Sequence, residues 1–295
     1  FMGASTGNML VDNTATLEGI FAATSLLVAT HCESTPMILE AEAAATAKWG
    51  EDIPFSEHPN IRSVEACYAS SSLAVGLARK HGTKLHVLHL TTAKELDLFD
   101  TGPIESKRIT AEACVHHLFF NSDDYADKGA LIKCNPAIKT PADQAALLKA
   151  VAEDRIDVIA TDHAPHTWEE KGRKYSTAPA GLPLVQHAVI SLLDRVTDGT
   201  FSIEQIVHKT AHAPAILYQV AERGFIREGY FADLILVSPD DEHVEMPILS
   251  KCGWSPFEGH KFSHRIDKTW VNGHLRYTDG SVQPGPFGQA LTYRR

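Results

Sequence analysis

The sequence of 295 residues lacks three features that would assign it to particular protein classes. Its five cysteines form no CxxC pair, so neither a zinc ribbon nor a disulfide framework is indicated, and an odd, scattered set fits a reducing compartment. No apolar run approaches the roughly 20 residues that span a bilayer, and no signal peptide is visible. We therefore expect a cytoplasmic protein with no membrane partner.

An excess of basic charge is also absent. The formal net charge of −10 argues against a nucleic-acid partner, because nucleic-acid-binding surfaces are usually basic. With 44% hydrophobic and 22% charged residues, the composition is that of an ordinary globular protein. What the sequence does contain is 16 histidines, several of them in close pairs, and this bias favours a metal site.

One stretch organises the rest of the chain. The β-branched apolar run 156–159 is followed by Asp162, His163 and His166, and Pro165 prevents the strand from continuing. This pattern predicts a buried strand that ends at side chains able to bind metal or transfer protons. Taken alone, it is equally compatible with a polar turn in which Asp162 has a capping role.

The same pattern occurs twice earlier in the chain. The apolar run 26–30 ends at His31, and the run 85–88 leads to His89. Residues this far apart can converge only if their strands are parallel and the strand ends ring a common axis, which predicts a (β/α)8 TIM-type barrel. Imidazole and carboxylate groups are zinc ligands, so His31, His89 and Asp162 are candidate metal ligands. A single histidine on a strand is more often a core residue, but three coordinated cases favour a site.

Strands and helices alternate along most of the chain, which is typical of an α/β fold. We expect helices at 16–25, 36–48, 63–81, 140–153, 182–196 and 202–217, one helix beginning at Thr92, and a strand from 108 that runs on through 118. The polar loop 168–181 is long enough to cover a barrel mouth. From residue 224 onward short strands appear, with an Asn272-Gly273 hairpin turn between the last two. The predicted domains are therefore a barrel at 1–223 and a small β-sandwich appendage at 224–295.

Four motifs, in their chain order, resemble those of dihydroorotases in the amidohydrolase superfamily. They are HVLHLTT at 86–92, TAEAC at 110–114 followed by His116-His117, KCNP at 133–136, and TDHAPH at 161–166. The last is the most specific, because hydantoinases and allantoinases usually differ after TDH. The resemblance implies a metal-dependent hydrolase barrel with two zinc ions, bridged in many members by a carboxylated lysine, and a C-terminal segment that belongs to a composite sandwich.

The resemblance also implies a role for individual residues. His31 and His89 match the ligands of the second metal, Asp162 matches a ligand of the first metal that also shuttles a proton, and Asn135, His166, Ala180 and Gly181 match groups that contact substrate. His163 is expected to have a supporting or structural role. For His116 and His117 a structural role and a role near the site both stay open.

Several groups of the family pattern have no counterpart in this sequence. The bridging lysine, the His-x-His ligand pair and a substrate-binding arginine are expected upstream of Phe1. Either the sequence starts partway through a longer molecule that carries the N-terminal strands, or the chain is not a competent catalyst. We favour the first alternative, because a barrel without these strands would expose its core and its edge groups.

The function implied by the resemblance is the reversible cyclisation of N-carbamoyl-L-aspartate to L-dihydroorotate in de novo pyrimidine biosynthesis. The partner would be this small-molecule substrate, and a homodimer is an expected assembly. Two alternatives stay open: another cyclic amidohydrolase, such as a hydantoinase or allantoinase, and a catalytically inactive dihydroorotase-like scaffold.

Overall fold

The computed structural model describes residues 2–4, 10–240 and 247–294. The chain divides into two compact units, each with its own internal contacts. The first unit comprises residues 1–185 and 250–256, and the second comprises 186–249 and 257–295. The predicted domain boundary at residues 223 and 224, drawn from the short strands expected after it, stays a prediction.

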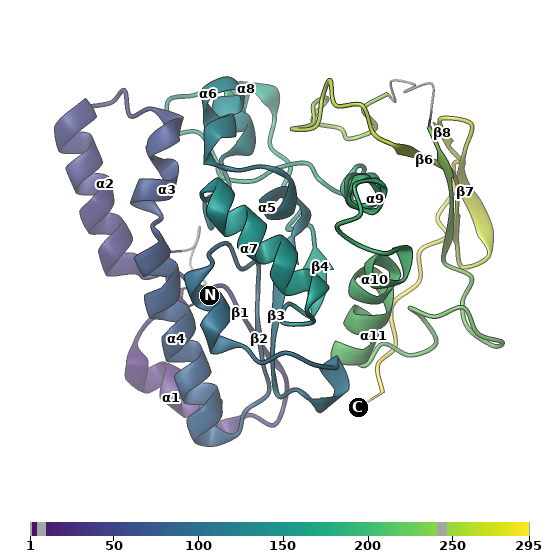
Figure 1. The fold of residues 1–295 in the computed structure, drawn as a ribbon, viewed down its shortest axis with the longest axis horizontal. Coiled ribbons are helices and arrows are strands. Elements are labelled where there is room, and N and C mark those ends of the chain that lie inside the picture. Colours follow the sequence, from purple (N-terminus) through teal and green to yellow (C-terminus); the bar gives the residue numbers. More distant parts are fainter. Residues whose placement is uncertain (1, 5–9, 241–246, 295) are drawn as a thin grey trace. The chain divides into compact units, whose positions relative to one another are not determined.

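A parallel sheet forms the centre of the first unit. Its four strands are β1 (Val28–Thr30), β2 (Leu85–Val87), β3 (Ile109–Cys114) and β4 (Val158–Ala160), in the order β1-β2-β3-β4 (Figure 1). Neighbouring strands pair in register, as in Ala29 with His86 and Ala113 with Ile159. All three residues of β2 are buried, as expected for a parallel sheet covered on both faces.

Helices surround this sheet where the sequence predicts them. The longest are α1 (Thr14–Ala23), α2 (Thr35–Trp49), α4 (Val64–His81) and α7 (Pro141–Ala152). The Ser63 hydroxyl caps α4 by accepting a hydrogen bond from Ala66 N at 3.2 Å, and Gly82 ends the helix with a φ of 68°. Thr140 and Asp143 form a capping box at the start of α7. These local signals therefore fix the ends of the helices that flank the sheet.

Shorter elements connect these helices and strands. They are α3 (His58–Ile61), α5 (Val115–Phe119), α6 (Tyr125–Lys128), α8 (Trp168–Lys171) and the 3₁₀ turns η1 (Phe55–Glu57), η2 (Lys94–Leu98), η3 (Ile104–Ser106), η4 (Ser122–Asp124) and η5 (Gly129–Ile132).

Two expectations for the first unit are wrong. The strand predicted from 108 through 118 ends at Cys114, because its last partner on β4 is Ala160, and the chain then turns into α5. The helix expected from Thr92 is reduced to η2. The Thr92 hydroxyl accepts a hydrogen bond from Glu95 N, as an N-cap residue does, but the backbone becomes extended at Phe99 and only the short 3₁₀ turn forms.

The second unit contains helices and an antiparallel sheet. The helical segments are α9 (Ala188–Thr197), α10 (Ile203–Val207), the π-helical turn η6 (His208–His212) and α11 (Ala213–Leu217), and the strands β5 (Leu234–Pro239), β6 (His264–Val271), β7 (His274–Thr278) and β8 (Ser281–Val282) pair in this order. The predicted hairpin is confirmed: Asn272 and Gly273 join β6 to β7 with φ values of 51° and 79°.

Two predicted helices of this region have different limits. The helix expected from 182 begins only at Ala188, because Leu184 N and Val185 N donate to His163 Nδ1 instead of starting a helix. The helix expected at 202–217 is interrupted by η6, just before Pro214, which has no N–H to donate to the preceding turn. Among the described residues no helix is both long and apolar enough to cross a lipid bilayer.

Candidate active site

The predicted metal ligands follow three strands of the parallel sheet at the same edge. His31 comes directly after β1, His89 lies two residues after β2, and Asp162 lies two residues after β4. Parallel strands bring their carboxyl ends to one edge, so the topology gathers these residues. His89 and Asp162 have positive φ values of 39° and 48°, so the backbone turns sharply at both positions.

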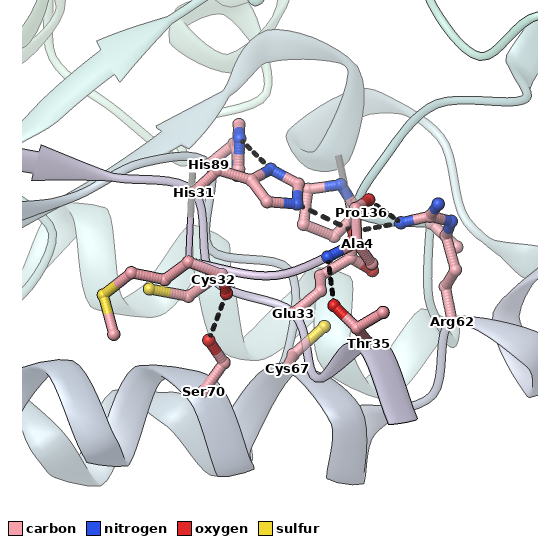
Figure 2. Close-up of polar contacts among 12 residues, drawn as sticks. Ala4, His31, Cys32, Glu33, Thr35, Arg62, Cys67, Ser70, His89 and Pro136 are labelled. Atoms are coloured by element: carbon pink, nitrogen blue, oxygen red, sulfur yellow. Dashed lines mark hydrogen bonds and ion pairs between the residues drawn. The ribbon is translucent and has the colours of Figure 1, made fainter. Parts of the chain in front are cut away.

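The imidazoles of His31 and His89 face each other. His31 Nδ1 and His89 Nε2 lie 3.1 Å apart, the ring centroids are separated by 4.8 Å, and both side chains are buried (Figure 2). Burial and the adjacent His31 lower the pKa of His89 below its ordinary value, so the His89 ring is neutral at neutral pH. Neutral imidazole is the form that binds metal.

A buried carboxylate orients His31. Glu33 is fully buried, and its Oε2 lies 3.1 Å from His31 Nε2 (Figure 2). Arg62 forms an ion pair with the same carboxylate and donates to Ala4 O at 3.2 Å. Burial by itself raises the pKa of the Glu33 carboxyl, but Arg62 and His31 outweigh it and hold the pKa at about 2. The charged Glu33 therefore favours the tautomer with the proton on His31 Nε2, which leaves the lone pair on His31 Nδ1.

The His31–His89 pair fits a zinc ion. Two nitrogens bound to one tetrahedral zinc at about 2.0 Å lie roughly 3.3 Å apart, close to the 3.1 Å between His31 Nδ1 and His89 Nε2. A carboxylate behind a ligating histidine is the usual support of such a site, and Glu33 has that place. The donor set and its support therefore match a metal centre.

Asp162, the third predicted ligand, follows β4. Its side chain is exposed, and its negative charge acts to raise the pKa of His89. The same charge acts to raise the pKa of the thiols of Cys114 and Cys134, which are buried. The structure thus brings Asp162 within electrostatic range of His89, while its role as a metal ligand stays a prediction.

The predicted substrate contacts lie in two loops that touch each other. Gly181 N donates to Lys133 O at 2.9 Å, and Lys133 is two residues before Asn135. His166 Nε2 lies 3.3 Å from Ala180 O. Gly181 has a φ of 142°, and a Cβ there would lie 2.5 Å from Ala164 O and 3.0 Å from His166 Nε2, so only glycine permits this approach. The structure therefore groups His166, Ala180 and Gly181, and Asn135 lies two residues from the contact at Lys133.

Asn135 carries an unsatisfied polar atom in this group. Its Oδ1 is buried and has no hydrogen-bond partner among the described residues. A buried amide oxygen without a partner is costly, and a ligand that donates a hydrogen bond would satisfy it. The atom is therefore suited to bind substrate.

Two buried lysines hold the loop that carries Ala180 and Gly181. Lys171 Nζ donates to Lys133 O, Pro179 O and Gly181 O at 3.2, 3.0 and 3.0 Å. Lys133 Nζ donates to Tyr175 O and Ala178 O at 2.6 and 2.7 Å. Burial lowers the pKa of each ammonium to about 8. The ammonium groups of Lys133 and Lys171 thus hold the loop of residues 168–181 through hydrogen bonds to its backbone carbonyls.

The remaining histidines of the motifs have different surroundings. His163 Nδ1 accepts hydrogen bonds from Leu184 N and Val185 N at 2.9 and 3.2 Å, which is the structural role expected for it. His116 and His117 are buried on α5, with ring centroids 3.9 Å apart. For His116 and His117 both of the expected roles stay open.

Sequence reasoning missed the groups that support the site. Glu33 stands two residues after His31, and its spacing was a usable signal for a carboxylate that orients a ligand. Arg62, Lys133 and Lys171 gave no such signal, because surface lysines and arginines are common and only the fold shows that their ends are buried.

The geometry described above matches a known family. Residues 14–276 match the model of the amidohydrolase family. The chain belongs to the amidohydrolase family. This confirms the resemblance drawn from the four motifs, and residues 14–276 include each of the predicted site residues.

Relatives in this family carry more than one name. A dihydroorotase of Halobacterium salinarum is 35% identical over 264 residues, which cover 88% of this chain and 60% of the relative. An allantoinase of Bacillus velezensis is 30% identical over 287 residues, covering 95% of this chain and 62% of the relative. A dihydroorotase of Pyrococcus furiosus is 30% identical over 293 residues, covering 99% and 63%. The chain thus spans about 60% of the length of these relatives.

Solved structures support the fold. The L-hydantoinase of Arthrobacter aurescens matches with a TM-score of 0.87 and 22% identity, covering 99% of this chain and 67% of that one. A D-hydantoinase of a Thermus species matches with a TM-score of 0.82 and 19% identity, covering 96% of this chain and 64% of that one. The chain therefore has the α/β fold of TIM-barrel type that the sequence predicts, with a parallel sheet and an antiparallel sheet.

Proposed function

We propose that the protein is a zinc-dependent dihydroorotase that interconverts N-carbamoyl-L-aspartate and L-dihydroorotate, a step of pyrimidine biosynthesis, in the cytoplasm. The observation that carries the proposal is the buried pair of His31 Nδ1 and His89 Nε2, 3.1 Å apart, with Glu33 behind His31. The dihydroorotase relatives and the TDHAPH motif at 161–166 favour this substrate among the cyclic amides.

His31 and His89 would hold one zinc ion, and Asp162 would bind beside it. When bound, metal ions of this kind lower the pKa of water toward neutrality and polarise a carbonyl group. The residues of the chain supply the rest of the chemistry. Glu33 fixes the tautomer of His31, and the lowered pKa of the buried His89 keeps that ring neutral and able to bind metal.

Asp162 would move the proton in this reaction. Opening a cyclic amide requires a proton to leave the attacking water and a proton to reach the departing nitrogen, because an amide nitrogen is a poor leaving group as an anion. The Asp162 carboxylate can take the first proton and deliver it to the nitrogen. Its exposed position at the end of β4 gives it access to both.

Substrate binding would fall to the two touching loops. The unsatisfied Asn135 Oδ1 would accept a ring N–H, and His166 and the backbone of Ala180 and Gly181 would contact the rest of the substrate. Lys171 holds this backbone through three carbonyl groups. Contacts of this kind set orientation, on which the rate of an addition to a carbonyl strongly depends.

A second candidate is another cyclic amidohydrolase, favoured by the allantoinase of Bacillus velezensis at 30% identity over 95% of this chain. Turnover of dihydroorotate, hydantoin and allantoin by the full protein separates the candidates. We expect dihydroorotate to be the best substrate by kcat/KM. A clear preference for hydantoin or allantoin would contradict the dihydroorotase proposal in favour of that substrate. A protein that binds no zinc and turns over none of the three would be a catalytically inactive scaffold.

A further inference from the structure

A cluster of soft ligand atoms that includes none of the predicted ligands lies at the end of β3. Cys114 is the last residue of β3, and His116 and His117 follow it in α5. Their ligand atoms all lie within 4.8 Å of one another, and the three residues are 0%, 1% and 3% exposed. The turn from strand to helix therefore brings one thiol and two imidazoles together in the interior.

His116 is the least satisfied member of the cluster. Both of its ring nitrogens are buried and have no hydrogen-bond partner among the described residues. His117 Nε2 lies 3.1 Å from Pro136 O, while its Nδ1 is unsatisfied. A buried imidazole normally has a partner for each nitrogen, because a lost hydrogen bond in the interior costs about 1–3 kcal/mol. Each neutral ring therefore has one nitrogen lone pair that a cation could accept.

We propose that Cys114, His116 and His117 form a separate metal site for a thiophilic cation with a filled d shell, Zn²⁺ or Cu⁺. One thiolate and two imidazoles are the donor set that such ions prefer. Donor atoms around one zinc lie roughly 3.3–3.7 Å apart, so the cluster needs adjustments of only about 1 Å to close around an ion.

The charge of the cluster suits this ion. Burial lowers the pKa of His116 to about 3, so its ring is neutral and can bind a metal ion. Burial raises the pKa of the Cys114 thiol, so without metal the sulfur carries its proton. On binding, the S–H bond breaks, the proton leaves to solvent and the sulfur–metal bond forms, which leaves one negative charge beside the cation.

Cobalt(II) is the probe for the thiolate ligand. Co²⁺ bound to a thiolate shows a sulfur-to-metal charge-transfer band in the near ultraviolet, which imidazole and carboxylate ligands do not produce. We expect the band on titrating the wild-type full protein with Co²⁺. We expect it to be lost in Cys114→Ser and weakened in His116→Gln, and kept in Cys67→Ser. Cys67 is the matched control, since its side chain is also fully buried in the first unit.

The His31→Ala variant tests whether the site is separate. The band should persist in this variant. Elemental analysis of Cys114→Ser should show about one metal equivalent fewer than wild type. The element that decreases, zinc or copper, identifies the bound ion. Absence of the band in the wild-type protein would overturn the proposal whether or not the variants fold. Its survival in Cys114→Ser, or its loss in His31→Ala, would do the same. These readouts do not depend on catalytic activity.

Discussion

The two sheets of this protein differ in how deeply they are buried. In the first unit every residue of β2 and five of the six residues of β3 are buried. In the second unit no residue of β6, His264–Val271, is buried. Parallel strands covered on both faces hold their ends rigidly, whereas an antiparallel sheet can face water. All three predicted ligands follow strands of the buried sheet, and the predictions below test this contrast.

The largest effect is expected for the histidine pair of the first unit. His31→Ala and His89→Ala should each lose bound zinc and reduce turnover to background, because one ligand of the 3.1 Å pair is gone. Metal content and initial rates of purified protein measure both. His81→Ala, a change on the outer end of α4, is the control and should behave as wild type. Full zinc content in His31→Ala would refute its assignment.

The next effect is expected at the end of β4. Asp162→Asn should lower kcat on the order of 10²–10⁴-fold, the usual contribution of a general acid–base group, while His31 and His89 keep at least one ion. Rate measurements paired with metal analysis separate the two effects. Unchanged turnover would show that Asp162 does not carry the proton.

A smaller effect is expected for Glu33, the carboxylate that contacts His31. Glu33→Gln should weaken zinc binding by about 10–100-fold, because the carboxylate that orients His31 loses its charge and Arg62 loses its partner. Competition with a chelator measures the zinc affinity. Glu65→Gln, on the exposed start of α4, is the matched control. Equal affinities in the two variants would count against a role for Glu33.

The loop of residues 168–181 should respond through substrate binding. Lys171→Met removes three hydrogen bonds to Lys133 O, Pro179 O and Gly181 O, and we expect KM to rise about tenfold, or ~1.4 kcal/mol, with a smaller change in kcat. The matched control is Lys174→Met in the same loop, whose ammonium pairs with the exposed Glu51 and Asp52. The same KM in both variants would refute the fastening role.

The smallest effect on activity is expected in the second unit, where a change should alter stability instead. The ring of His187 packs on Phe257 and Phe262, with centroid distances of 5.7 and 5.6 Å, and burial lowers its pKa to about 4. The unfolded chain, with an ordinary pKa near 6.5, then binds more protons between about pH 6.5 and 4. The free energy of unfolding should therefore fall as pH drops through this window, by on the order of 2 kcal/mol.

His187→Phe removes this titration and keeps the ring packing. We expect the variant to lose less stability than wild type between pH 6.5 and 4, with unchanged kcat at neutral pH. Denaturant unfolding at a series of pH values measures the difference. Parallel pH profiles of stability for the two proteins would contradict the role of His187. A large loss of turnover in the variant would contradict the expectation that changes in the second unit alter stability and not activity.

The sequence by itself determined the local features of this protein. Ser63, Gly82 and the Thr140–Asp143 box mark helix ends, and Asn272-Gly273 marks the hairpin, because capping and turn preferences act between neighbours in the chain. The ends of apolar runs also placed His31 and His89 at one edge, since parallel strands align their carboxyl ends.

Only the tertiary structure decided which groups support those residues. Arg62 reaches Glu33 across 29 positions and Lys171 reaches Lys133 across 38, and such pairings follow from packing rather than from any local pattern. The helix expected from 182 failed for the same reason, because His163 bonds the backbone at Leu184 and Val185. Local preferences are weak compared with the bonds that a buried group must satisfy, so the fold settles these positions.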